Sequence, residues 1–281
     1  MEEETRVTRH VDVIVMAIKS YDTAECITEL EAIKDNLPPI LCLQNGVDNE
    51  TLLAEAFGLE RVIAGTLTTA VSKNNYGEVI VERARGMGLV EGHPLSCSLA
   101  AALGASGFMT KLYRNTLAMK WSKLLTNLLT NAACAICDLP PRQILEHDGL
   151  YQTEIAALRE ALDVMKRMSI PVVDLPRTSA RALSFAARHL HPSIYRTFLT
   201  KQVDTGRGDK MPSFHIDLLS GRNRSEVSFL NGAVSKHGEA IAVNTPVNRR
   251  LTEILTAITQ GRMEWDTYRY HPDKLADKLI G

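Results

Sequence analysis

The order of apolar runs in the first third of the chain is the feature that most constrains its fold. The run from Val11 to Ile18 is apolar and rich in β-branched residues, which is typical of a strand covered on both faces. An amphipathic helix is expected over 24–34, a second buried strand over 40–43, and a second helix over 49–57. This alternation of strand and helix predicts a doubly wound parallel sheet. Later strands are expected over 62–70, 79–82 and 108–112, with a helix over 95–103.

The pattern changes near residue 113, where long amphipathic helices replace the alternation. The clearest of them is expected over 151–168, and others over 226–237 and 250–259. The sequence therefore predicts two domains, an α/β domain over 1–113 and an all-helical C-terminal domain over 114–281.

Composition argues against several classes of protein. The formal net charge of the 281 residues is -1, which gives no reason to expect a nucleic acid or an anionic membrane as partner. No apolar run approaches the roughly 20 residues that span a bilayer, and the acidic N-terminus lacks the apolar core of a signal peptide. Five cysteines, an odd number without framework spacing, suit a reducing compartment. These features predict a cytoplasmic protein.

A row of polar side chains interrupts an apolar segment that begins at Trp121. At helical spacing, Lys123, Asn127 and Asn131 fall at i, i+4 and i+8, so an ammonium and two carboxamides would share one face of a single helix. Leucines at 124, 125, 128 and 129 predict that this helix packs against a core. Half-buried polar groups need partners, which a ligand with a carbonyl and hydroxyls would supply. A solvated helix edge is the alternative.

Several short strings follow one another in order along nearly the whole chain. Besides 121–131, they are Ala17-Ile18-Lys19, Gln44-Asn45-Gly46, Val62-Ile63-Ala64-Gly65, Pro212-Ser213-Phe214-His215-Ile216-Asp217, and the segments 221–227, 230–232 and 244–248. In this order and at these separations, they resemble the ketopantoate reductase (2-dehydropantoate 2-reductase) family. The resemblance implies a Rossmann-like dinucleotide-binding domain, followed by a helical domain of the 6-phosphogluconate dehydrogenase type.

The resemblance also implies a reaction. NADPH would reduce the ketone of 2-dehydropantoate to the alcohol of pantoate, a step of pantothenate and coenzyme A biosynthesis. The developing alkoxide then needs a proton and electrostatic stabilisation. By resemblance, Lys123 is the general acid that supplies both. Asn127 and Asn131 match asparagines that bind the substrate's oxygens, and Ser213 matches a serine that meets its carboxylate. The implied partner is thus a small 2-keto acid, and the implied cofactor is NADP.

Three residues are candidates for binding the cofactor. Lys19 and Asn45 directly follow the first two predicted strands, and ligands of doubly wound sheets sit outside such strand ends. By resemblance, Lys19 contacts the cofactor, Asn45 contacts both cofactor and substrate, and Glu226 helps to hold the cofactor. Without the resemblance, Lys19 would be a solvated lysine, Asn45 a turn residue with a left-handed backbone, and Glu226 a glutamate stabilised at a helix start.

The chain departs from the family pattern in its substrate region and at its front. The segment 138–142 replaces a further substrate-contacting asparagine, and one extra residue lies between Asp217 and Glu226. The Gly-rich turn that opens the family's sheet is absent from the sequence, so the Rossmann-like domain is expected to be incomplete and NADPH binding weak. The chain is then either a shortened form of an ordinary reductase or a genuine short form with a damaged cofactor site.

These departures leave other functions open. One alternative is a non-catalytic binding or scaffolding relative of the family, and another is a reductase of a different branched 2-keto acid. An exposed sheet edge would favour pairing with a second copy, which makes a homodimer a candidate assembly.

Two patterns imitate other kinds of site. Cys134 and Cys137 form a CxxC, but no second CxxC and no paired histidines follow at metal-ligand distance. Both cysteines are expected to continue the helix of Lys123, so they are interpreted as buried structural thiols and no metal site is predicted. The glycines at 86, 88 and 92 follow GxGxxxG rather than the dinucleotide fingerprint GxGxxG, so this segment is interpreted as a glycine-bearing strand.

Overall fold

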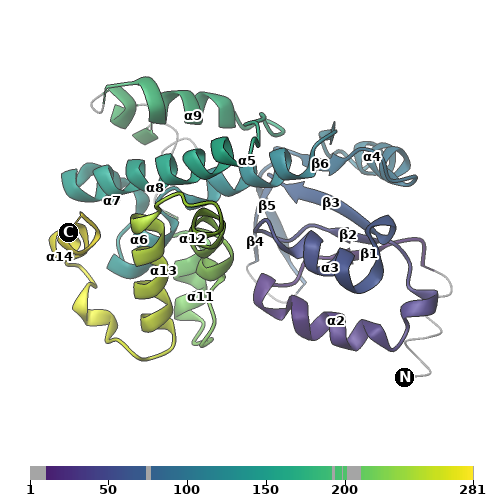
Figure 1. Ribbon diagram of the computed structural model, residues 1–281, viewed down its shortest axis with the longest axis horizontal. Helices are drawn as coiled ribbons and strands as arrows, with labels where there is room; N and C mark the ends of the chain where they lie inside the picture. Colours follow the sequence, from purple (N-terminus) through teal and green to yellow (C-terminus); the bar gives the residue numbers. More distant parts are fainter. Residues whose placement is uncertain (1–10, 74–76, 192–193, 198, 201–209, 281) are drawn as a thin grey trace. The chain divides into compact units, whose positions relative to one another are not determined.

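The computed structural model describes residues 11–73, 77–191, 194–197, 199–200 and 210–280. By its internal contacts the chain falls into two compact units (Figure 1). Unit 1 comprises Met1–Lys123 and Val172–Ala180, and unit 2 comprises Leu124–Pro171 and Arg181–Gly281. The division follows Lys123 within helix α5 (Thr116–Leu128), whereas the sequence placed a domain boundary near residue 113. The extents of the two domains stay predictions.

Unit 1 is built on a five-stranded sheet with the strand order β1-β2-β3-β6-β7. Its strands are β1 (Ile14–Met16), β2 (Ile40–Cys42), β3 (Val62–Leu67), β6 (Met87–Val90) and β7 (Thr110–Tyr113). β1, β2 and β3 are parallel to one another, and so are β6 and β7, but β6 runs antiparallel to β3. The predicted α/β class with a Rossmann-like parallel sheet is confirmed, and the antiparallel junction is an addition to it.

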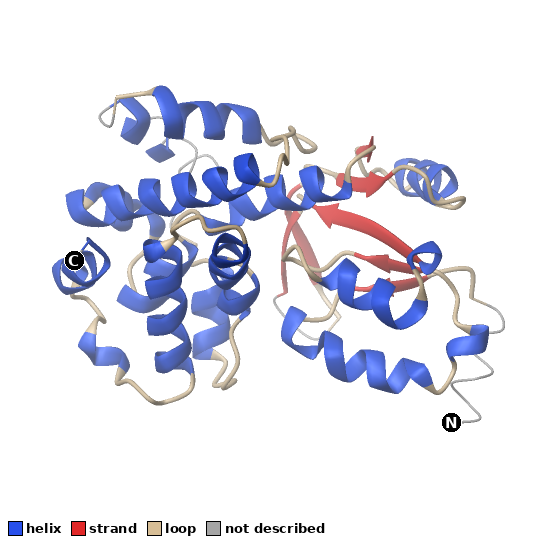
Figure 2. Cartoon of the chain, viewed as in Figure 1, coloured by secondary structure: helices blue, strands red, loops and turns tan. Residues whose placement is uncertain are grey.

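Helices cover both faces of this sheet (Figure 2). Successive side chains of a strand point to opposite faces. Accordingly, Ile40 and Cys42 pack in one core with helices α2 (Thr23–Glu31) and α3 (Asn49–Phe57). Leu41 lies in the other core, with side chains of α4 (Ser96–Ala105). Short 3-10 turns complete the connections: η1 (Ser20–Asp22), η2 (Lys34–Asn36) and η3 (Leu59–Arg61).

The strand predicted over 62–70 is divided in two. β3 ends at Leu67, and β4 (Ala70–Lys73) pairs with β5 (Val79–Arg83) in a separate antiparallel ribbon. The reason lies at Thr68, whose backbone N–H and hydroxyl both donate to the carbonyl of Gly86 at 3.0 Å. These two bonds tie Thr68 to the start of β6, and the following residues leave the sheet.

The elements of unit 2 in the described ranges are helices, which confirms the predicted helical class. The long helix α8 (Asp148–Arg167) packs against α7 (Pro141–Glu146), α12 (Asn231–Ala240), α13 (Pro246–Thr259) and α14 (Pro272–Ile280). Further elements are α6 (Asn131–Cys137), α9 (Ala180–His189), α11 (Ser213–Leu219), η4 (Glu226–Phe229) and η5 (Trp265–Thr267). Over the residues that the structure describes, no helix is both long and apolar enough to cross a bilayer.

The prediction of one continuous helix through Lys123, Asn127 and Asn131 is wrong. α5 ends at Leu128 and α6 begins at Asn131, because Thr130 has a left-handed backbone with φ of 59°. A β-branched residue rarely adopts this conformation. The backbone N–H of Thr130 donates to the buried Glu154 carboxylate at 2.7 Å instead of continuing the helix. Cys134 and Cys137 consequently belong to α6 and do not continue the helix of Lys123.

Candidate functional site

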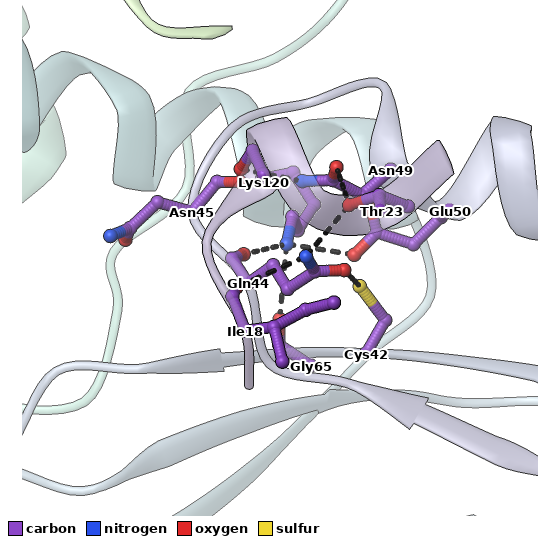
Figure 3. A network of polar contacts seen from close by, with 10 residues as sticks. Ile18, Thr23, Cys42, Gln44, Asn45, Asn49, Glu50, Gly65 and Lys120 are labelled. Carbon is purple, nitrogen blue, oxygen red and sulfur yellow. Dashed lines mark hydrogen bonds and ion pairs between the residues drawn. The ribbon is translucent and has the colours of Figure 1, made fainter. Parts of the chain in front are cut away.

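A network of polar contacts in unit 1 includes Asn45, one of the two predicted site residues that follow strands (Figure 3). Lys19 follows the end of β1, precedes η1 directly and is half-buried. Asn45 follows β2 and is also half-buried, and its side chain points away from the network (Figure 3). Both residues therefore stand at carboxyl ends of parallel strands, where doubly wound sheets bind ligands.

The backbone of Asn45 is fixed by neighbouring side chains. Its carbonyl accepts hydrogen bonds from Asn49 Nδ2 at 2.7 Å and from Ser20 Oγ at 2.9 Å. The left-handed residue of this turn is Gly46, with φ of 91°, and not Asn45 as the alternative interpretation required. The left-handed backbone of this turn is thus supplied by the glycine and not by the asparagine.

A buried lysine that the sequence analysis missed lies at the centre of the network. Lys120, on α5, is only 2% exposed. Its Nζ lies 2.7 Å from Glu50 Oε1, and donates to the carbonyls of Gln44 at 2.6 Å and Gly65 at 3.3 Å (Figure 3). The only signal in the sequence is its setting between Met119 and Trp121, since a lysine with bulky apolar neighbours on a packed helix needs a buried partner.

The predicted general acid, Lys123, follows Lys120 by nearly one helical turn. It is half-buried on α5 and is the last residue of the first segment of unit 1. Lys123 and Lys120 thus differ in exposure, and of the two Lys123 is the more accessible to a ligand.

The structure brings three predicted substrate residues of unit 2 together. Asn131 Nδ2 donates to Ser213 Oγ at 3.3 Å and to the carbonyl of Asn127 at 3.2 Å. Asn131 Oδ1 accepts from the backbone N–H of Phe214 at 3.1 Å. Asn131 is 2% exposed and Asn127 is 9% exposed, while Ser213 is half-buried. The carboxamide of Asn131 therefore ties the start of α6 to the start of α11, and so orients Ser213.

Glu226 begins the short turn η4 and is 2% exposed. The hydroxyl of Ser225 accepts a hydrogen bond from the N–H of Val227 and caps this turn. Glu226 thus occupies the helix start that the alternative interpretation gave it.

A polar cluster surrounds Asp138, the first residue of the segment 138–142 that lacks the family asparagine. Asp138 accepts hydrogen bonds from Tyr270 at 2.7 Å and from Arg269 Nε at 2.9 Å, and His215 Nε2 lies 2.6 Å from its other oxygen. Burial acts to raise the pKa of Asp138, but the bonds from Tyr270, His215 and Arg269 outweigh it and lower the pKa below its ordinary value. The cluster anchors α11 to the end of α6, close in sequence to Ser213.

Three further features of the described residues were compared with the predicted site: the CxxC cysteines, groups of metal-ligating side chains, and a pocket in unit 1. Cys134 and Cys137 are fully buried. Burial is the main cause that raises the pKa of Cys137 to about 12, and the negative charge of the nearby Glu154 raises it further. Across the described ranges no group of three or more metal-ligating side chains occurs. A pocket of about 370 Å³ in unit 1 is lined by residues of the β4–β5 ribbon, Arg177 and the segment 106–109. None of the predicted site residues lines it.

Comparisons with known proteins agree with this architecture. The family model described as ketopantoate reductase PanE/ApbA C terminal matches residues 115–259, and that of ketopantoate reductase PanE/ApbA matches residues 1–91. A 2-dehydropantoate 2-reductase of Archaeoglobus fulgidus is 24% identical over 254 residues, which are 89% of this chain and 77% of the relative. The corresponding protein of Halobacterium salinarum is 26% identical over 257 residues, 89% of this chain and 76% of its own.

Solved structures give the same fold. A PanE/ApbA family ketopantoate reductase from Ralstonia eutropha has a TM-score of 0.75 at 22% identity, over 92% of this chain and 79% of that chain. A D-mandelate dehydrogenase with NADH and anilino(oxo)acetate has a TM-score of 0.71 at 20% identity, over 89% of this chain and 77% of that chain. At these identities the likeness concerns the fold alone. The family models, one of which covers more than half of the sequence, are decisive: the chain belongs to the ketopantoate reductase PanE/ApbA family.

Proposed function

We propose that this chain is a reductase that converts 2-dehydropantoate to pantoate with NADPH, in pantothenate and coenzyme A biosynthesis. The observation that carries the proposal is family membership together with the cluster of Asn127, Asn131 and Ser213. The two curated relatives described above are named 2-dehydropantoate 2-reductase, and this chain matches each of them over most of its length.

The residues at the strand ends of unit 1 fit a dinucleotide. A lysine can pair with a phosphate, and a carboxamide can both donate to and accept from ribose hydroxyls. Lys19 and Asn45 offer these groups, and the side chain of Asn45 is directed outward from its turn (Figure 3). NADPH, when bound, supplies the hydride. We assign Lys19, Asn45 and Glu226 to its binding, and Asn45 also to the substrate.

The remaining roles follow from the charge that develops on the substrate. As the carbonyl carbon is reduced, its oxygen becomes an alkoxide that must be protonated. Lys123 is assigned as the ammonium that stabilises this oxygen and gives it the proton. Asn127, Asn131 and Ser213 are assigned to the substrate's oxygens, and Asn131 also orients Ser213 through their 3.3 Å contact.

A second candidate keeps the same chemistry but changes the substrate. The solved D-mandelate dehydrogenase structure contains NADH and anilino(oxo)acetate, a ligand of the 2-keto acid type. The segment 138–142, which lacks a family asparagine, favours a substrate pocket with altered contacts. Another 2-keto acid, or NADH in place of NADPH, is therefore the alternative to be compared.

The assembly and location of the protein are proposed on separate grounds. A ketopantoate reductase from Staphylococcus aureus with the same fold is described as dimeric, which supports a homodimer here. All five cysteines are free thiols, which supports a reducing compartment such as the cytoplasm.

An activity assay with matched variants tests the reductase proposal. Oxidation of NADPH or NADH is followed at 340 nm with 2-dehydropantoate and with a series of branched 2-keto acids. Lys123→Ala is expected to lower turnover by about 10²–10⁴-fold, and Lys166→Ala, at an exposed position of α8, to leave it unchanged. Turnover of Lys123→Ala within a few-fold of wild type would remove Lys123 from the mechanism. A folded wild-type chain without activity on any of these acids would point to a non-catalytic relative.

A further inference from the structure

The ammonium of Lys120 donates two hydrogen bonds to backbone carbonyls and forms an ion pair with a buried carboxylate. A lysine ammonium carries three N–H donors. Three oxygens surround Lys120 Nζ: Glu50 Oε1 at 2.7 Å, the Gln44 carbonyl at 2.6 Å and the Gly65 carbonyl at 3.3 Å. Lys120 and Glu50 are 2% and 8% exposed. To act on a ligand, Lys120 would have to break contacts that it already makes, so it is not suited to be the proton donor.

The oxygens that Lys120 contacts lie on three different elements. Gln44 follows β2, Gly65 belongs to β3, and Glu50 lies in the first turn of α3. One side chain of α5 therefore holds two neighbouring parallel strands and the helix that follows the first of them. The same network contacts the segment after β1 and the start of α2. Gln44 Nε2 donates to the Ile18 carbonyl at 3.1 Å and to Thr23 Oγ1 at 2.8 Å.

Asn45 stands between two fixed points of this network. On one side, the Gln44 carbonyl accepts from Lys120. On the other, the Asn45 carbonyl accepts from Asn49 and Ser20, and Thr23 Oγ1 donates in turn to Asn49 Oδ1 at 3.1 Å. With both carbonyls held, the direction in which the Asn45 side chain leaves the backbone is set (Figure 3).

We propose that Lys120 and Glu50 are a positioning pair, which fixes the Gln44–Asn45–Gly46 turn so that Asn45 is presented to its ligands. The proposal rests on the proposed function, since Asn45 is assigned there to cofactor and substrate. Replacement of a buried ion pair by apolar groups is often neutral for stability, so the fold alone does not require these charges. An apolar pair cannot supply a directed hydrogen bond to the Gln44 carbonyl, and that bond is what the turn needs.

The test separates loss of the turn from loss of the fold. Lys120→Met keeps the aliphatic stem but leaves Glu50 as an unpaired buried charge, and such variants can fail to fold. Lys120→Met/Glu50→Gln removes both charges, and is expected to unfold at a denaturant concentration close to that of wild type. Lys34→Met, at an exposed position of unit 1, is the matched control.

Two readouts are taken on the double variant and the control. Hydrogen exchange of the backbone amides of 44–50 is expected to be at least about 10-fold faster in the double variant, and unchanged in the control. The kcat/KM of the reductase is expected to fall about 10- to 100-fold, mainly through KM for the 2-keto acid and the nucleotide, because a displaced binding group loses alignment. The pH profile of the remaining activity should keep its shape, because Lys123 and not Lys120 carries the proton.

Each result decides one of the two proposals. Wild-type exchange at 44–50 in the double variant would overturn the positioning pair, as would faster exchange with wild-type KM values or an altered pH profile. A wild-type chain without nucleotide binding or turnover would refute the proposed function. The exchange measurement would then still show whether the pair holds the turn.

Discussion

Glu154 Oε2 accepts a hydrogen bond from the backbone N–H of Thr130 at 2.7 Å, and both residues are buried in unit 2. The bond lies at the break between α5 and α6, which separates Asn127 from Asn131. Burial raises the pKa of Glu154 to about 7, and the bond from Thr130 opposes this only in part. The geometry between two predicted substrate residues thus depends on a carboxyl group that titrates near neutral pH.

The stability of the protein should therefore depend on pH through Glu154. Its pKa is higher in the folded chain than in the unfolded chain, so its stabilising contribution is complete below the ordinary carboxyl pKa and is lost as the pH rises through about 7. The loss between pH 4.5 and 8 is expected to be up to about 3 kcal/mol. Glu154→Gln should remove this part of the dependence, and Glu253→Gln, at an exposed position of α13, should not. Urea unfolding at several pH values measures it, and an identical pH slope in Glu154→Gln would contradict the assignment.

Asn127→Ala and Ser213→Ala should mainly weaken substrate binding. Under the proposed function, each variant would lose a hydrogen bond to an oxygen of the 2-keto acid, so KM should rise about 10- to 100-fold. The affinity for NADPH should stay nearly unchanged, because Lys19, Asn45 and Glu226 are assigned to it. Ser235→Ala, which removes a hydroxyl bonded to the Asn231 carbonyl, is the control. The assignment fails if both variants lose NADPH binding while the substrate KM is kept.

Asp138→Asn should destabilise unit 2 by about 2 kcal/mol, since it weakens charge-assisted bonds from Arg269, His215 and Tyr270. Asparagine tolerates the left-handed backbone of this position (φ 53°), so the variant tests the charge and not the turn. The pKa of Asp138 is lowered in the fold, so this contribution is present at neutral pH and is lost as the pH falls through that lowered pKa. Chemical denaturation at pH 7 compares it with Tyr270→Phe, expected to cost about 1 kcal/mol. Equal losses in the two variants would argue against a role for the charge.

Alanine substitutions at Gly86 and Gly92 should differ in their cost to stability, because the space around the two glycines differs. Both have positive φ, 138° and 99°, but an added Cβ at Gly86 would lie 2.1 Å from the Met109 carbonyl oxygen, whereas at Gly92 it would meet nothing within 4 Å. Gly92→Ala should cost about 1 kcal/mol through backbone strain alone. Gly86→Ala should cost about 3 kcal/mol or more, because the backbone must also move. Thermal unfolding of the two variants measures the difference, and equal melting temperatures would contradict the packing argument.

Local patterns predicted the elements of the fold but not their relations. The helix expected over 49–57 is α3 itself, and the strand over 40–43 is β2, because each carries its periodicity or apolar character within the segment. The antiparallel pairing of β6 with β3 was not predictable, since an apolar run does not record the direction of its neighbour.

The misses at the site have the same physical origin. The helix break at Thr130 depends on Glu154, which follows it by 24 residues. The role of Lys120 depends on oxygens of Gln44, Glu50 and Gly65, each more than 50 residues earlier in the chain. Sequence spacing marks which polar residues share a segment, whereas their partners are known only once the chain has folded.

The distribution of the five thiols has a practical consequence for spectroscopy. The thiolate is the form that reacts with maleimides. Burial, with the neighbouring carboxylates of Glu50 and Glu154 respectively, raises the pKa of Cys42 and Cys137 to about 12, and Cys134 is fully buried. Burial raises the pKa of the partly exposed Cys26 as well, whereas Cys97 on α4 is exposed. A dye added at neutral pH should therefore attach first at Cys97, so the unmodified chain already carries a preferred labelling position on unit 1.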